Sequence, residues 1–113
     1  MEYKFDRNDD WFYVFSKEEK LKTLERFTNY GWTSQKIQNL IEEVDRSRDQ
    51  ESENSFDWQN EDVFFRSNKY GVFFVDLMSR RAGQKSEKQD LVLEHDEFIK
   101  FLKSFKKFIE ENS

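Results

Sequence analysis

The 113-residue chain contains no cysteine, no proline and only three glycines. Without cysteine it can form neither a disulfide framework nor a thiolate zinc site, so its fold depends on packing. The glycines lie at positions 31, 71 and 83, too far apart for a glycine-rich phosphate loop or a Gly-x-Ser-x-Gly nucleophile elbow. These absences exclude several common catalytic and nucleotide-binding motifs.

Histidine is nearly absent as well, since His95 is the only one. One interpretation makes it a general base or a metal ligand, and the other makes it a boundary residue near the start of a helix. We favour the second, because the chain has no other His or Cys to complete a metal site and no nucleophile motif. The sequence therefore predicts a protein that is not an enzyme and that uses no cofactor and no metal.

Long apolar runs are missing too. No stretch approaches the roughly 18 apolar residues of a membrane-spanning helix. The first residues alternate between apolar and charged, whereas a secretory signal has a basic start and an apolar run of about 7–15 residues. We therefore expect a cytoplasmic protein that makes no contact with a membrane.

Aromatic residues are abundant. Only 35% of the residues are hydrophobic and 38% are charged, a balance that by itself favours disorder. However, 13 Phe, 4 Tyr and 3 Trp make up 18% of the chain, and each ring can remove about 150–250 Å² from water. Few residues can thus build a large core, and the length fits a single domain spanning residues 1–113.

The start of the chain predicts a hairpin and a helix. Residues 1–7 alternate with period two, as a half-buried strand does, and residues 11–15 form a second, aromatic strand after the turn cluster at 8–10. Ser16 and Glu19 have the spacing of a capping box, which predicts a helix that ends near Gly31. The inner face of this helix would consist of Leu21, Leu24 and Phe27.

A second helix is predicted from Thr33 or Ser34, either of which can cap it. Its inward residues have the i, i+3, i+4, i+7 spacing of an amphipathic helix. They are Ile37, Leu40, Ile41 and Val44. Residues 45–55 that follow are wholly polar, and we expect an acidic, solvated loop or a frayed helix end there.

The second half returns to aromatic runs at residues 56–59, 63–66 and 70–77, the last two joined by a hairpin connection at 67–69. A short strand is predicted around 91–93 and a final helix over 96–111, whose apolar face holds Phe98, Phe101, Leu102, Phe105, Phe108 and Ile109. The element order ββααβββα predicts an α+β fold, mainly an antiparallel sheet with helices packed on one face.

Residues 79–88 form a polar loop with four basic side chains, Arg80, Arg81, Lys85 and Lys88. Such a loop, together with aromatic rings that can stack on bases, is compatible with binding of single-stranded nucleic acid. That mode needs a positively charged groove, whereas the chain has a net charge of −5. We therefore expect no direct contact with nucleic acid.

Acidic residues are distributed unevenly. Residues 1–62 hold 16 acidic and 9 basic side chains, whereas residues 63–113 hold 8 and 10. Residues 42–62 carry nine acidic and two basic side chains, a net charge of −7. Because charge of one sign accelerates encounter with a partner of the opposite sign, we predict that this stretch binds a basic protein. The predicted site residues are Glu42, Glu43, Asp45, Asp49, Glu51, Glu53, Asp57, Trp58, Glu61 and Asp62.

Trp58 has two interpretations. A tryptophan flanked by charge is typical of an interface anchor with a polar surround. It is equally typical of a core residue in an edge strand, in which case the acidic residues only keep the protein in solution. The sequence leaves both open.

The chain resembles the small acidic immunity proteins of bacterial contact-dependent growth inhibition. The resemblance rests on size, acidity and the strand-plus-helix ending at residues 90–102. It implies a non-catalytic cytoplasmic α+β protein that binds and blocks a toxin domain, often a basic nuclease. The opening strand with Met1, Tyr3 and Phe5 is also similar to that of a family of small bacterial proteins without assigned function.

We therefore expect a protein-binding domain, specifically an immunity protein that neutralises a cognate basic toxin domain, as a monomer or weak dimer. The alternative is a structural or regulatory adaptor that self-associates. It follows from the 20 aromatic residues, which can exceed what one core covers and leave an apolar patch on the surface.

Overall fold

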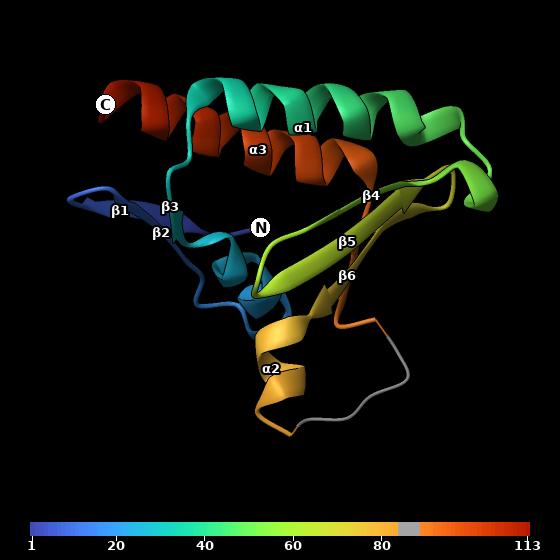
Figure 1. Cartoon of the computed structure of the whole chain (residues 1–113), viewed down its shortest axis with the longest axis horizontal. Coiled ribbons are helices and arrows are strands. Elements are labelled where there is room, and N and C mark those ends of the chain that lie inside the picture. Colours follow the sequence, from blue (N-terminus) through green and yellow to red (C-terminus); the bar gives the residue numbers. More distant parts are fainter. Residues whose placement is uncertain (84–88) are drawn as a thin grey trace.

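Two antiparallel sheets lie beneath two long helices in the computed structural model, which describes residues 1–83 and 89–113 (Figure 1). The first sheet has the order β1-β2-β3 and consists of β1 (Lys4–Asn8), β2 (Trp11–Phe15) and β3 (Asn29–Tyr30). The second has the order β4-β5-β6-β7 and consists of β4 (Phe56–Gln59), β5 (Val63–Asn68), β6 (Gly71–Asp76) and β7 (Leu91–Leu93). The predicted α+β fold is confirmed, with its strands divided between two sheets.

The helices α1 (Ser34–Arg46) and α3 (His95–Glu111) lie side by side and run in opposite directions (Figure 1). Thr33 caps α1 by accepting a hydrogen bond from the Lys36 amide at 3.1 Å, as its sequence predicts. Glu94 and Glu97 form a capping box at the start of α3. The predicted inward faces of both helices are confirmed, except that Phe108 is only half-buried.

Residues 16–31 differ from the prediction. The segment is a 3₁₀ helix, η1 (Glu19–Phe27), and the capping box is not formed. Instead, the Ser16 hydroxyl donates to the Glu2 carbonyl at 2.7 Å and accepts from the Glu18 amide at 3.1 Å. The buried apolar residues are spaced by three, and a 3₁₀ helix has three residues per turn, so its face matches them. They are Leu21, Leu24 and Phe27, and Thr23 is buried beside them.

The core joins the two sheets to the helices. Phe65 and Phe74 are opposite each other on β5 and β6, and each ring lies 5.0 Å from that of Phe98 on α3. From the first sheet, Phe5 stacks on Phe105 of α3 at 5.1 Å. A single aromatic core therefore spans both sheets, as expected for one domain.

The connection between β5 and β6 depends on glycine. Gly71 begins β6 with φ +131°, and a Cβ atom there would lie 3.3 Å from the Leu93 carbonyl oxygen. A side chain would therefore strain the backbone and press on β7.

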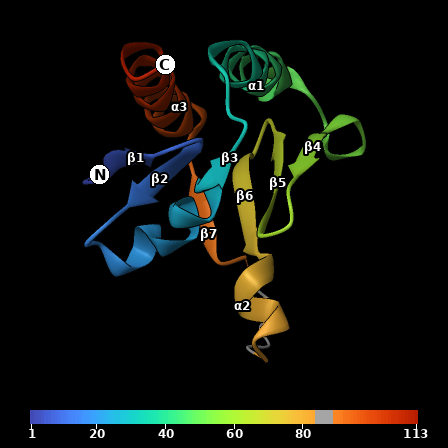
Figure 2. The same ribbon diagram turned by 60° about the vertical axis from the view of Figure 1, so that its left-hand side comes forward.

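Polar segments lie at two ends of the molecule. Residues 45–55 comprise the end of α1 and two short 3₁₀ turns, η2 (Ser47–Asp49) and η3 (Ser52–Asn54), mostly exposed. The predicted loop from residue 79 begins with a short helix, α2 (Leu77–Arg81), which lies opposite the long helices (Figure 2). Lys85 and Lys88 lie outside the described residues. Among the residues described, no helix combines the length and apolarity needed to cross a membrane.

Candidate protein-binding site

The predicted acidic residues occupy a continuous length of chain but several elements. Glu42, Glu43 and Asp45 are on the last turns of α1, and Asp49 is in η2. Glu51 directly precedes η3 and Glu53 is in it. Asp57 and Trp58 are on β4, and Glu61 and Asp62 form the turn that leads into β5. We refer to this set as the acidic surface.

Basic residues from the second half of the chain neutralise part of the acidic surface. Arg66 on β5 binds Asp57 on β4 through two parallel hydrogen bonds of 2.8 and 2.9 Å. Lys69 binds Glu51 at 2.6 Å. Arg81 binds Asp62 at 2.8 Å. The net charge of −7 for residues 42–62 thus overstates the negative charge that this surface offers a partner.

Within the stretch itself, Arg46 pairs with Glu43, and Arg48 pairs with Asp45 at 2.8 Å and also with Asp96 of α3. Four predicted residues make no ion pair with any described residue. These are Glu42, Asp49, Glu53 and Glu61, all exposed. Negative charge available to a basic partner is therefore concentrated on them.

The ion pairs shift the ionisation of their members. Hydrogen bonds from Arg66 lower the pKa of the Asp57 carboxyl below its usual 3.8. A hydrogen bond to Glu51 raises the pKa of the Lys69 ammonium. Both pairs are partly exposed, so each contributes little to stability.

Trp58 packs in the core and also reaches the surface. Its half-buried ring stacks on Phe27 at 5.5 Å and on Trp32 at 5.8 Å, so it belongs to the core packing. Its remaining surface lines an open groove of about 490 Å³ between α1, β3 and β4. Glu43 of the acidic surface and Tyr30 line the same groove. We call it the tryptophan groove.

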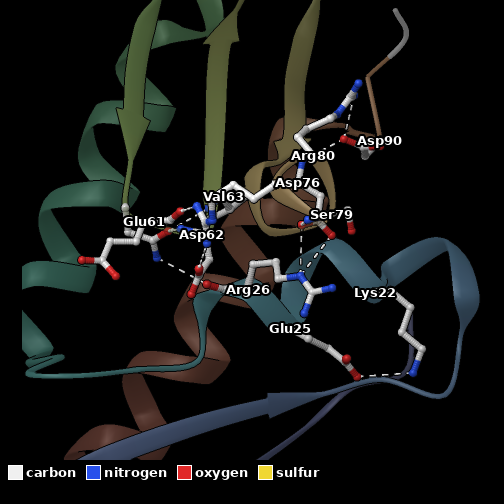
Figure 3. A network of polar contacts seen from close by, with 12 residues as sticks. Lys22, Glu25, Arg26, Glu61, Asp62, Val63, Asp76, Ser79, Arg80 and Asp90 are labelled. Carbon is white, nitrogen blue, oxygen red and sulfur yellow. Dashed lines mark hydrogen bonds and ion pairs between the residues drawn. The ribbon is translucent and has the colours of Figure 1, made fainter. Parts of the chain in front are cut away.

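Glu61 and Asp62 also border a polar network (Figure 3) at the lower pole of the molecule, which is the end where α2 lies in Figure 1. At its centre, both carboxylate oxygens of the buried Asp76 share the Nε–H of Arg26, at 3.0 and 3.1 Å, and Asp76 also accepts from the Ser79 amide at 2.9 Å. Asp90 accepts from the Asp76 amide at 2.7 Å. The network fixes η1, α2 and the approach to β7 to one another.

Arg81 continues this network to the acidic surface. Besides Asp62, it donates to the carbonyl of Glu61, while the Asn60 side chain donates to the carbonyl of Arg26 at 3.3 Å. The turn between β4 and β5 is therefore tied to its neighbours. The Asp62 carboxylate at that turn has a structural role that the sequence pattern did not indicate.

His95 is the first residue of α3, directly after its N-cap residue Glu94. Its Nε2 lies 2.6 Å from the Asn68 carbonyl oxygen, which links the start of α3 to the end of β5. In the described part of the chain, no three His, Asp or Glu side chains are arranged so that they could hold a metal ion.

The sequence prediction missed an aromatic surface on the first sheet. Trp11, Tyr13 and Phe15 of β2 and Tyr30 of β3 line up with ring centroids 5.3 to 6.4 Å apart. Phe12 and Val14 between them are buried, because successive side chains of a strand point to opposite faces. All five residues of β2 are apolar or aromatic, so the sequence carried no signal for which face is exposed. We call these four side chains the aromatic stripe.

Comparison with known proteins yields no match among family models, curated proteins or solved structures. Inference about function therefore starts from the acidic surface, the tryptophan groove and the aromatic stripe.

Proposed function

We propose that the protein is a non-catalytic binding domain of the cytoplasm that neutralises a basic partner, specifically an immunity protein for a nuclease-type toxin domain. The observation that carries this proposal is the set of four exposed carboxylates on the same stretch of chain as Trp58 that make no ion pair with a described residue. Glu43, which lines the groove with Trp58, adds a carboxylate that is paired with Arg46. A concave aromatic site with a charged border is typical of an interface with a hydrophobic centre and a polar rim.

The two parts contribute differently to binding. Exposed carboxylates attract a basic partner over a distance of about 10 Å, so they raise the association rate and make it depend on salt. The groove offers desolvated contact to a partner side chain, which slows dissociation. A stable complex needs about 1,200–2,000 Å² of buried surface in total, more than the groove alone supplies. Neighbouring surface must therefore take part.

The first test is whether the gene upstream encodes a large protein that ends in a toxin domain. That domain is then expressed as a catalytically inactive variant. We expect binding at low salt and inhibition of the active toxin. A triple variant Glu42→Gln, Asp49→Asn, Glu53→Gln should lower the association rate and its salt dependence while the dissociation rate stays nearly constant. Glu19→Gln, Glu110→Gln, Glu111→Gln changes the net charge equally and should have a much smaller effect. Absence of binding at low salt would contradict the proposal.

A second candidate is the self-associating adaptor. The exposed aromatic stripe favours it, because a contiguous apolar patch on a sheet face usually marks an interaction surface. Static light scattering separates the candidates. A dimer at micromolar concentration that the Tyr30→Ala substitution dissociates supports self-association, and a monomer at high concentration excludes it.

A further inference from the structure

The aromatic stripe exposes more apolar surface than a sheet face in water usually does. Relative exposure is 42% for Trp11, 40% for Phe15 and 65% for Tyr30. Large apolar side chains that stand alone on a surface are ordinary, but adjacent ones mark an interaction site. Seven large hydrophobic side chains are exposed in the described residues, and three of them belong to the stripe. The other four are Met1, Tyr70, Met78 and Val92.

The stripe is continuous with hollows at both ends. Tyr30 lines the tryptophan groove at one end. Phe15 lines a wider hollow of about 850 Å³ at the other end, together with Met1. A partner that enters the groove can therefore continue along the first sheet, which provides the additional surface that the groove lacks.

Carboxylates accompany the rings at the Trp11 end of the stripe. Cross-strand partners share a face of the sheet, so Asp6 lies beside Tyr13 and Asn8 beside Trp11, whereas Lys4 lies beside Phe15 at the other end. Asp9 and Asp10 form the hairpin turn next to Trp11. None of these three aspartates makes an ion pair with a described residue, unlike most of the acidic surface.

The nearest arginine does not neutralise this end of the stripe. Arg7 alternates with Asp6 along β1 and belongs to the opposite face of the sheet. Its guanidinium lies 5.9 Å from the centre of the Phe12 ring and donates to the carbonyls of Asp9 and Asn112. The carboxylates beside Trp11 and Tyr13 thus remain available to a cation from outside.

We propose that the aromatic stripe is a docking surface for an arginine-rich segment of a protein partner. Guanidinium groups stack on aromatic faces and at the same time bind carboxylates, so both features of the stripe suit the same side chain. The partner is basic in this proposal because the proposed function requires it. The stripe then supplies the aromatic contacts and the acidic surface supplies the attraction.

A second copy of the chain fits the stripe less well. In a symmetric dimer the same patch faces itself, which would bring the unpaired aspartates of both copies together. If the full surface of each ring is about 200 Å², the exposed fractions of the three rings add up to roughly 300 Å². A stable interface buries about 800 Å² on each partner. A nucleic acid would be repelled by the same carboxylates.

The test uses a ten-residue peptide of alternating Arg and Gly, with Lys-Gly and Glu-Gly peptides of equal length as controls. The three Trp residues give three indole N–H signals in an NMR spectrum, which Trp→Phe variants assign. The Trp32 indole is an internal reference because it is buried and donates to the Phe27 carbonyl at 2.7 Å. We expect saturable shifts of the Trp11 signal with Arg-Gly, smaller shifts with Lys-Gly and none with Glu-Gly.

Tyr30 and Tyr70 provide a matched pair of variants, since they are 65% and 64% exposed and Tyr70 lies outside the stripe. Tyr30→Ala should weaken Arg-Gly binding about two- to fivefold, the effect of losing one exposed cation–π contact. Tyr70→Ala should leave it unchanged. The double variant Asp9→Asn, Asp10→Asn should bind Arg-Gly more weakly than the wild type does, and this difference in affinity should grow as the salt concentration is lowered.

Other outcomes overturn the inference. Equal binding of Arg-Gly and Lys-Gly, or equal effects of Tyr30→Ala and Tyr70→Ala, would show that the rings do not take part. A Trp58 shift without a Trp11 shift would move the contact to the tryptophan groove and leave the proposed function intact. Light scattering that reveals a dimer lost in Tyr30→Ala would assign the stripe to a second copy. Lack of binding by both peptides and by the toxin domain would remove the proposed function too.

Discussion

Two sets of aromatic rings in this molecule have the same chemistry and opposite environments. Phe65, Phe74 and Phe98 are fully buried, with ring centroids 5.0 to 5.7 Å apart. Trp11 and Phe15 are in the aromatic stripe at similar ring spacings, yet they are exposed. The comparison teaches that aromatic content alone does not measure the core. What separates the sets is which face of a strand or helix each ring occupies.

The largest expected loss of stability comes from removing one ring of the buried set. Phe98→Ala should lower the free energy of unfolding by about 3–5 kcal/mol, because the cavity it leaves is surrounded by packed rings. Urea unfolding followed by circular dichroism measures the change. Trp11→Ala is the matched change in the exposed set and should cost less than about 1 kcal/mol. A similar loss in both would contradict the division between the sets.

Buried and exposed ion pairs should differ in the same way. Asp76→Ala should lower the unfolding free energy by about 3 kcal/mol, because it leaves Arg26 without its carboxylate and the Ser79 amide without its acceptor. Replacing an exposed member, as in Glu51→Gln, should cost no more than about 1 kcal/mol. Thermal unfolding of the two variants compares them, and equal melting temperatures would show that the network at the lower pole is not structural.

Trp58 is half-buried, so its exposure lies between those of the buried rings and the aromatic stripe. Trp58→Ala should cost about 2–3 kcal/mol of stability, less than a fully buried ring, since part of its surface lines the groove. It should also speed dissociation of the toxin domain. Urea unfolding and a dissociation rate measured on the same sample separate the effects. Unchanged dissociation would assign Trp58 to the core alone.

The smallest effect concerns pH. Arg66 lowers the folded-state pKa of Asp57 below 3.8, so this pair stabilises the fold above the unfolded pKa and the contribution disappears as pH falls through the folded pKa. Asp57→Asn should therefore cost at most about 1 kcal/mol at pH 7 and nothing once the pH is well below 3.8. Urea unfolding at several pH values tests this. A difference that persists in strong acid would point to a packing defect.

Regular periodicity explains which parts of the fold were predictable. The four inward residues of α1 and those of α3 repeat over several turns, and the structure confirms both helices. The sequence did not distinguish the 3₁₀ helix at residues 19–27 from an α-helix, because a spacing of three, as between Leu21 and Leu24, also fits one face of an α-helix over two turns. β3 has two residues and depends on its pairing with β2, which leaves no local pattern to detect.

The candidate site was less predictable because ion pairs join distant parts of the chain. Arg66 and Lys69 neutralise Asp57 and Glu51 only after β4 and β5 have paired. A count of charges along the sequence cannot include them. The aromatic stripe was not predicted, because the run Trp-Phe-Tyr-Val-Phe of β2 is apolar on both faces. Which face would turn inward depended on the position of α3.

The central claim is that the buried rings stabilise the fold and that the aromatic stripe binds an arginine-rich segment of a partner. The most direct test is to measure the unfolding free energy of Trp11→Ala and its affinity for the Arg-Gly peptide in parallel. We predict an unfolding free energy within about 1 kcal/mol of the wild type and an affinity reduced at least about twofold. Unchanged affinity combined with a loss of about 3 kcal/mol or more would contradict the claim, because Trp11 would then belong to the core.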